Sequence, residues 1–271
     1  MKALILQMRG NGDPSRAIEQ QEYLDYTGLD AQQIDFVDLY DCPDFSPLKL
    51  LAYDILFVGG ISRDKATELS WPEQRFPFIR NLHRLLQLAI EKKIPALLSC
   101  GGFAIAGDML GAQTLVKTQG FELGVYPLYK TQSGKVDILL KPLSDGFQIV
   151  SGHVKYFTKS PPGTELLLYS NSYGEQIPVH AFKVSNAPFY AFQGHPEISC
   201  SELFDRVKPM LYRKQYFPKR AGVAEDERQG YNDEAFQHFC KLKSDTSEAQ
   251  SLLNRFVKLV EKGVFRQNIK S

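Results

Sequence analysis

Cys100 stands where a nucleophile would be expected. It lies in the run Ser99-Cys100-Gly101-Gly102, directly after the apolar residues 94–98 and directly before a stretch with helical spacing. A strand that turns sharply into a helix, with a nucleophile at the corner, is the nucleophile elbow of hydrolases. At a helix N-terminus the unpaired N–H groups and the helix dipole stabilise a thiolate, and glycines leave room for a substrate carbonyl. An ordinary buried cysteine would explain the same stretch, so the decision depends on partner residues.

His195-Pro196-Glu197 supplies such partners. Proline fixes its own φ angle and favours an extended conformation in the residue before it, so His195 and Glu197 can project to the same side of the chain. The carboxylate can then accept a hydrogen bond from one ring nitrogen and leave the other to exchange a proton with a thiol. Alone, the triplet fits a structural histidine in a turn. Together with Cys100 it favours a Cys-His-Glu relay.

A second glycine pair, Gly59-Gly60, follows the apolar run 55–58. If this run and the one before Cys100 form adjacent parallel strands, N–H groups near Gly60 and Gly101 can converge on one oxygen. Acyl transfer needs such an oxyanion hole as much as it needs a nucleophile. The glycine pair therefore strengthens the hypothesis of an acyl-transfer site.

The remaining sequence predicts the elements that would position this site. Strands are expected at residues 1–8, 34–39 and 55–58, with a helix after Pro14 and a long amphipathic helix over residues 72–92. This order predicts a parallel sheet covered by helices. Short runs separated by turns, one of them at Ser133-Gly134, predict an antiparallel extension between residues 121 and 191.

Two further segments are less specific. Residues 61–71 are long enough to lie over the site as a lid, in which Trp71 either takes part or simply packs at the start of the next helix. Beyond Ser201 the chain is helical and charged, with an exposed loop expected at residues 219–228 and packed helices over 233–260.

The composition argues against several classes of protein. With 32 basic and 31 acidic residues among 271, nothing indicates nucleic acid or an anionic membrane as the main partner. No apolar run approaches the length of a membrane span, and residues 1–8 are too short for a signal-peptide core. The four cysteines show no Cys-x-x-Cys spacing, which argues against a zinc site and a disulfide framework. We therefore expect a cytoplasmic protein with no metal and no cofactor.

The order and spacing of the glycine pair, the cysteine corner and Phe192-Gln193-Gly194-His195-Pro196-Glu197 resemble the class I glutamine amidotransferase domain. The resemblance covers about residues 1–200. It implies an α/β fold, a flavodoxin-like three-layer sandwich with a central, mostly parallel sheet and an antiparallel extension. Residues 201–271 would be a helical C-terminal extension packed on the same domain.

The resemblance also assigns roles to residues. It implies that Cys100 is the nucleophile, His195 the general base and acid and Glu197 the residue that orients His195, with Gly60 and Gly101 forming the oxyanion hole. Contacts to the substrate are expected from Gly59, Gly102, Ser151 and His153, although a histidine on a surface strand explains His153 nearly as well.

Two positions depart from the family pattern. Leu98 stands where the family usually has glycine, so small neighbours such as Ala104 must accommodate its side chain at the tight corner. Ala104 itself replaces a glutamine that often helps to hold the amino-acid end of the substrate. A preference for free glutamine is therefore less firmly predicted than attack on a γ-glutamyl carbonyl.

Three interpretations of function follow. The first is a glutamine amidotransferase that forms a glutamyl thioester and releases ammonia, which passes to a separate synthase or is simply released. The second is a γ-glutamyl peptidase that uses the same residues on γ-glutamyl peptides. The third is a binding or regulatory module whose site is silent. The substrate is a small molecule in the first two, and in none is nucleic acid or a membrane expected as a partner.

Overall fold

The computed structural model describes residues 1–62, 70–116, 122–153, 155–171, 177–208, 237, 239 and 243–267. Its centre is a nine-stranded sheet with the strand order β2-β1-β3-β4-β11-β10-β9-β6-β7. The strands of this sheet are β1 (Ala3–Met8), β2 (Ile34–Asp38), β3 (Ile55–Ile61), β4 (Ala96–Ser99), β6 (Glu122–Lys130), β7 (Phe147–His153), β9 (Thr164–Ser170), β10 (Ile177–Val184) and β11 (Phe189–Phe192). A separate antiparallel pair joins β5 (Thr114–Val116) to β8 (Lys155–Phe157).

The central sheet has a parallel half and an antiparallel half. β1 pairs in parallel with β2 and β3, and β4 pairs in parallel with β3 and β11. From β11 the sheet continues through β10, β9, β6 and β7 by antiparallel pairing. This arrangement confirms the predicted parallel sheet with its antiparallel extension. It also makes the strand before Cys100 the direct neighbour of both the glycine-pair strand and the strand before His195.

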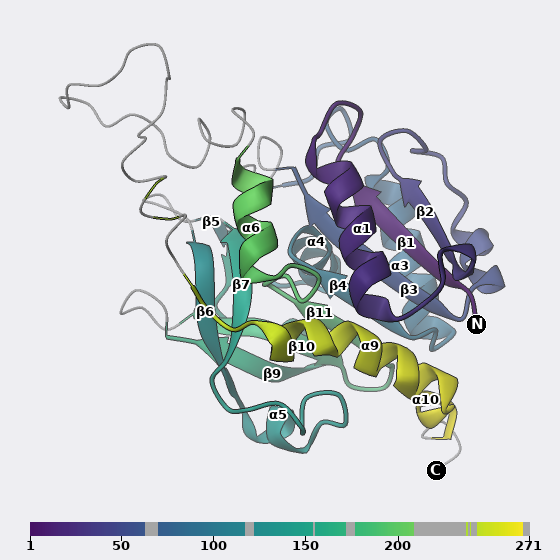
Figure 1. Cartoon of the computed structure of the whole chain (residues 1–271). Helices are drawn as coiled ribbons and strands as arrows, with labels where there is room; N and C mark the ends of the chain where they lie inside the picture. Colours follow the sequence, from purple (N-terminus) through teal and green to yellow (C-terminus); the bar gives the residue numbers. More distant parts are fainter. Residues whose placement is uncertain are drawn as a thin grey trace.

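Helices cover both faces of the parallel half. Helices α1 (Ser15–Thr27) and α9 (Ser247–Glu261) lie on one face, and α3 (Ile79–Glu91) and α4 (Gly101–Met109) lie on the other (Figure 1). The shorter helices are α5 (Gln132–Val136), α6 (Cys200–Val207) and α10 (Val264–Gln267), and 3₁₀ turns span Ala31–Gln33 and Pro47–Ala52. The predicted flavodoxin-like three-layer sandwich is confirmed.

Strand β1 shows how the sequence encodes these layers. All of its residues are buried, because one set of side chains faces α3 and α4 and the alternate set faces α1 and α9. Leu4, Leu6 and Met8 belong to the first apolar cluster, and Ala3 and Ile5 to the second. A parallel strand covered on both faces is mostly apolar, and only Gln7 interrupts the apolar residues of β1, which is why this run was recognisable in the sequence.

The glycine pair lies inside a strand and not in a turn after it. We expected the strand to end at Val58, but β3 runs through Gly59 and Gly60 to Ile61. Pairing with β1 continues to this point, with Met8 opposite Ile61 after a shift of register. The backbone pairing outweighs the weak strand preference of glycine.

The helix expected over residues 72–92 is shorter. Helix α3 begins at Ile79, and the chain before it forms turns. Pro77 explains the difference, because a proline disfavours the helical conformation in the residue before it. Trp71 packs edge-on against Phe76 with ring centroids 5.0 Å apart and is buried, so it is a packing residue of this turn region.

A second correction concerns Ser133-Gly134, predicted as a turn. These residues lie in α5, whose first turn is capped by the Thr131 hydroxyl, which accepts a hydrogen bond from the Gly134 N–H at 3.1 Å. Threonine at an N-cap favours a helix start. The short helix lies between β6 and β7 in an otherwise antiparallel region.

The C-terminal part packs against the sandwich where it is described. Leu252, Leu253 and Phe256 of α9 belong to the same apolar cluster as β1 and β3, and α6 follows directly on the His195 segment. The expected loop at 219–228, most of the expected lid and the first part of the expected 233–260 helices lie outside the described residues. The division of the chain at residue 200 stays a prediction.

Candidate active site

Cys100 occupies the corner between β4 and α4. Its backbone has a φ of 46° and a ψ of −96°, a conformation that side-chain-bearing residues rarely adopt. Such strain costs about 1–3 kcal/mol and persists only where the surroundings impose it. Here the Cys100 N–H donates to the Phe192 carbonyl at 2.9 Å, and the Cys100 carbonyl accepts from the Ala104 N–H at 3.0 Å. The corner therefore has the geometry of a nucleophile elbow.

The glycines after Cys100 allow α4 to approach β3 closely. A Cβ atom on Gly101 would lie 2.7 Å from the Ile61 nitrogen, and one on Gly102 would lie 2.9 Å from the Val58 carbonyl oxygen. The same atom on Gly102 would lie 3.2 Å from the Leu98 Cβ. Packing is thus sufficient to explain both glycines. It also shows that Gly102 makes room for Leu98, a role that the sequence had suggested for Ala104.

His195 and Glu197 form a buried pair beside this corner. The His195 Nδ1 and the Glu197 Oε1 are 2.6 Å apart. The backbone N–H of His195 donates a hydrogen bond to the Val150 carbonyl at 2.8 Å. Burial alone would lower the pKa of His195, but the Glu197 carboxylate and the negative charge at Cys100 outweigh it and raise the pKa to about 10. The site therefore favours a protonated His195 ring beside Cys100.

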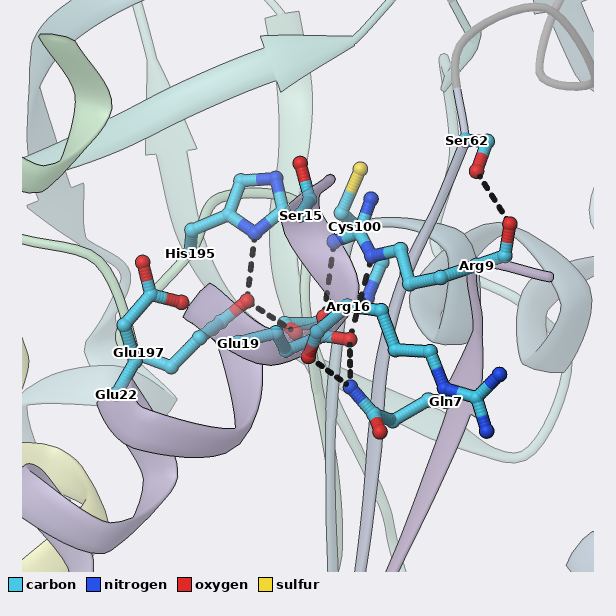
Figure 2. Close-up of polar contacts among 12 residues, drawn as sticks. Gln7, Arg9, Ser15, Arg16, Glu19, Glu22, Ser62, Cys100, His195 and Glu197 are labelled. Carbon is cyan, nitrogen blue, oxygen red and sulfur yellow. Dashed lines mark hydrogen bonds and ion pairs between the residues drawn. The ribbon is translucent and has the colours of Figure 1, made fainter. Parts of the chain in front are cut away.

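Cys100 and His195 share one small cavity. Figure 2 shows the His195 ring between the Glu197 carboxylate and the Cys100 sulfur. The cavity has a volume of about 50 Å³, which is room for only one or two water molecules. The described residues that line the cavity come from the Cys100 corner, from β3, β6 and β7, from the start of α1, from helix α6 and from the segments next to β1 and α6. They are Arg9, Ser15, Ile61, Cys100, Leu123, Val150, Gly152, His195, Ile198, Leu203, Arg206 and Val207.

The predicted oxyanion residue Gly60 is engaged elsewhere. Its N–H donates to the Glu19 Oε1 at 3.3 Å, within hydrogen-bond reach of a fully buried carboxylate. The neighbouring Gly59 has no space for a side chain, because a Cβ there would lie 2.5 Å from the same Glu19 oxygen. Contact with Glu19 therefore explains Gly59. An oxyanion role for Gly60 stays a prediction that requires its N–H to leave Glu19.

The structure does not place Ser151 and His153 among the described residues that line the cavity. They alternate along β7 with Gly152, which does line it and whose carbonyl lies 3.9 Å from the Cys100 sulfur. His153 is buried and not at the surface, and its Nδ1 lies 2.9 Å from the Lys155 carbonyl oxygen. Of residues 151–153, it is thus the backbone of Gly152 that lies next to the Cys100 sulfur, and not the side chain of Ser151 or His153.

A buried charge network next to the site was not predicted. The Arg9 guanidinium binds Glu19 through two nitrogens, at 2.8 and 3.2 Å, and Arg206 binds Glu22 in the same two-point manner. These four side chains are almost fully buried. Figure 2 shows the carboxylates of α1 directly below Cys100 and His195. Through Arg206, helix α6 is tied to α1 across 184 positions of sequence.

The two carboxylates of this network differ in their ionisation. Burial raises the pKa of Glu19, but Arg9 outweighs burial and leaves it below its ordinary value. Burial raises the pKa of Glu22 to about 7, because the nearby charges of Glu197 and Glu19 add to it and Arg206 offsets only part. In the sequence, the spacing of Glu19 and Glu22, three positions apart, could have indicated that both lie on one face of the helix. Nothing in the sequence indicated their arginine partners.

Two other features were sought in the described ranges, a metal site and a membrane-spanning helix. No group of three or more histidine, cysteine, aspartate or glutamate side chains there could hold a metal ion. In the same ranges, every helix is too short or too polar to cross a bilayer.

The chain is similar to known proteins in sequence and in fold, although no family model matches it. It is 30% identical over 105 residues to one subunit of a glutamine-hydrolysing GMP synthase from Ignicoccus hospitalis, a match that covers 36% of this chain and 53% of the relative. The corresponding GMP synthase subunit from Methanocaldococcus jannaschii is 28% identical over 136 residues, covering 48% of this chain and 65% of the relative. The chain thus spans about half to two thirds of the length of these relatives.

A solved structure extends the comparison to the whole fold. A glutamine amidotransferase from Thermotoga maritima superposes with a TM-score of 0.64 at 15% identity, and the match covers 100% of this chain and 99% of the other. At this identity the likeness concerns the fold.

Proposed function

We propose that this chain, which is class I glutamine amidotransferase-like in sequence and fold, hydrolyses a γ-glutamyl amide bond with Cys100 as the nucleophile. Free glutamine is the substrate we propose first. The observation that carries the proposal is the strained cysteine corner, held in one cavity with a histidine whose other side is bonded to a buried glutamate.

The proposed reaction divides the chemistry among these three residues. The Cys100 thiol first gives its proton to the His195 ring nitrogen that does not face Glu197, and the sulfur then attacks the γ-carbonyl carbon. His195 passes this proton to the amide nitrogen, the C–N bond breaks, ammonia leaves and a glutamyl thioester remains. Water then attacks the thioester and gives a proton to His195, which returns it to the sulfur as glutamate departs. Glu197 keeps the ring oriented throughout.

The oxyanion formed during attack needs two donors. The N–H of Gly101, at the start of α4, is the first donor that we propose, because it immediately follows the nucleophile. The second is the N–H of Gly60, once its bond to Glu19 has opened. Glu19 would then retain Arg9 and Gln7 as its partners.

Substrate binding requires the site to open. The cavity holds only one or two water molecules in this structure. Apolar residues of its lining, such as Leu123, Leu203 and Val207, must therefore move before a γ-glutamyl group can enter. Ala104, in the position of the family's glutamine, is buried in the apolar core and offers no polar contact. The amino-acid end of the substrate must therefore find other partners than in relatives that have the glutamine.

The name of the relatives suggests an acceptor for the ammonia. Each is named as one subunit of a GMP synthase, so we propose that a separate synthase protein receives the ammonia from this chain as well. A γ-glutamyl peptidase would use the same residues and the same thioester, with a peptide amine as the leaving group in place of ammonia.

The function is tested by incubating the purified chain with glutamine and, separately, with γ-glutamyl dipeptides. Release of ammonia and glutamate from glutamine supports the proposal, and release of glutamate from the dipeptides alone favours the peptidase. Cys100→Ala should abolish whichever activity is found. Cys42→Ala, at an exposed cysteine, is the matched control and should retain it. Absence of any release by the unmodified chain contradicts both activities.

A further inference from the structure

Ser99 ties the cysteine strand to the glutamate of the site. Its hydroxyl donates a hydrogen bond to the Glu197 Oε1 at 3.0 Å, although 98 positions separate the two residues. The same oxygen is the one that lies 2.6 Å from the His195 Nδ1. Ser99, at the end of β4, and His195, in the segment after β11, therefore share one acceptor atom.

The backbone fixes the position of this hydroxyl. Ser99 is the last residue of β4 and lies opposite Phe192 of β11, the strand that leads into the His195 segment. The next N–H, that of Cys100, donates to the Phe192 carbonyl at 2.9 Å. The serine is fully buried, so its side chain has little freedom to turn away.

Glu197 depends on its few donors. The side chain is fully buried, and within the described part of the chain its second oxygen, Oε2, has no hydrogen-bond partner. A buried carboxylate stays ionised only where hydrogen bonds and positive charge replace its lost water. The Ser99 hydroxyl and the His195 ring are the two groups that meet this need at Oε1.

We propose that Ser99 is a positioning residue of this site: its hydroxyl holds Glu197 in place as the acceptor for His195 and so sets how readily Cys100 reacts. The inference rests on the proposed role of Cys100 as the nucleophile. Ser99 itself touches neither the sulfur nor a substrate in this scheme. It acts through Glu197 and then through His195.

The expected effect follows from this chain of hydrogen bonds. Without the hydroxyl, Glu197 keeps one hydrogen bond in place of two and is free to turn away from the ring, so it stabilises the protonated ring less and the pKa of His195 falls from about 10. The pH at which the ring beside the sulfur loses its proton is therefore the quantity that Ser99 sets. A hydrogen bond to a charged group changes an equilibrium by on the order of tenfold, so we expect that pH to fall by about half to one unit.

The test measures the rate of Cys100 alkylation by iodoacetamide from pH 6 to pH 11, resolved by peptide mass spectrometry. Peptide resolution separates Cys100 from the exposed Cys42. The rate should change where the His195 ring loses its proton, and in Ser99→Ala this alkaline step should move to lower pH by about half to one unit. Ser99→Thr retains a hydroxyl and should keep the alkaline step of the unmodified chain.

The matched control is Thr131→Ala, which removes a hydroxyl bonded to the Leu166 carbonyl at 2.6 Å, far from Cys100 in the antiparallel half. It should lower the melting temperature and leave the alkaline step unchanged. A merely structural role for Ser99 predicts the same behaviour for Ser99→Ala, and that result would overturn the inference. An alkaline step that moves to higher pH, or one that moves equally in Ser99→Thr, would also overturn it.

Alkylation needs no turnover, so the two proposals can fail separately. If the chain releases neither ammonia nor glutamate but the alkaline step still depends on the Ser99 hydroxyl, the proposed function is wrong and the positioning role stands. If glutamine is hydrolysed through Cys100 while Ser99→Ala keeps both its alkaline step and its rate of hydrolysis, the positioning role is wrong and the function stands.

Discussion

Glu22 should make the stability of this protein fall as the pH rises from acid to neutral. Burial raises the pKa of its carboxyl to about 7 from an ordinary value of 4.5, because Arg206 offsets only part of the burial and the charges of Glu197 and Glu19 add to it. At a pH between 4.5 and about 7, the Glu22 carboxyl of the folded chain holds a proton that the unfolded chain has lost. The free energy of unfolding therefore decreases as pH increases across this window.

The magnitude follows from the width of the window. One unit of pKa difference corresponds to about 1.36 kcal/mol, so the difference between 4.5 in the unfolded state and about 7 in the folded state corresponds to about 3 kcal/mol. In Glu22→Gln the titrating group is gone. Arg206 stays charged beside a neutral amide, which changes the level of stability but adds no dependence on pH in this range.

Urea unfolding at intervals from pH 4.5 to pH 8 tests this expectation. The emission of the single tryptophan, the buried Trp71, and far-ultraviolet circular dichroism should give coincident transitions. The unfolding free energy of the unmodified chain should lose about 3 kcal/mol relative to that of Glu22→Gln across the range. The control Glu91→Gln, at an exposed helix end, should show no such change. A difference between the chain and Glu22→Gln that stays constant, or changes in the opposite direction, would refute the reasoning.

Three further predictions concern the site itself. Glu197→Gln removes the charge that supports the protonated His195 ring, so glutamine hydrolysis measured as ammonia release should fall by about 10²–10⁴-fold with an unchanged circular dichroism spectrum; a fall of less than about threefold contradicts this role. Leu203→Ala removes an apolar side chain from the lining of the cavity, so alkylation of Cys100 should become faster and the free energy of unfolding in urea should fall by about 2–5 kcal/mol. An unchanged rate of alkylation would show that small molecules reach Cys100 by another route. Gly101→Ala places a Cβ 2.7 Å from a backbone nitrogen of β3 and should lower the unfolding free energy by about 1–3 kcal/mol, and unchanged stability would show that the corner adjusts freely.

The sequence was most informative where burial and backbone geometry act locally. The mostly apolar character of β1 and the turn residues between residues 121 and 191 were enough to predict a parallel sheet with an antiparallel extension. Two of the errors occurred where a single residue decided a boundary. Pro77 delayed the start of α3, and Thr131 capped a helix where a turn was expected.

The candidate site divides in the same way. The Cys100 corner is encoded by adjacent residues, and so is the His195–Glu197 pair, which explains why both could be proposed before the structure was known. The Ser99–Glu197 bond and the Arg206–Glu22 pair join residues 98 and 184 positions apart. Such contacts depend on the register of strands and on helix packing, which one sequence does not specify.

Acid quenching during turnover tests the central proposal most directly. The chain is mixed with glutamine, quenched within seconds, digested and examined by mass spectrometry for a glutamyl group on each cysteine. The account predicts a glutamyl adduct on the Cys100 peptide that disappears when the substrate is exhausted, with none on the peptides of Cys42 and Cys200. Ammonia release with no adduct on Cys100, or with the adduct on another cysteine, would contradict it.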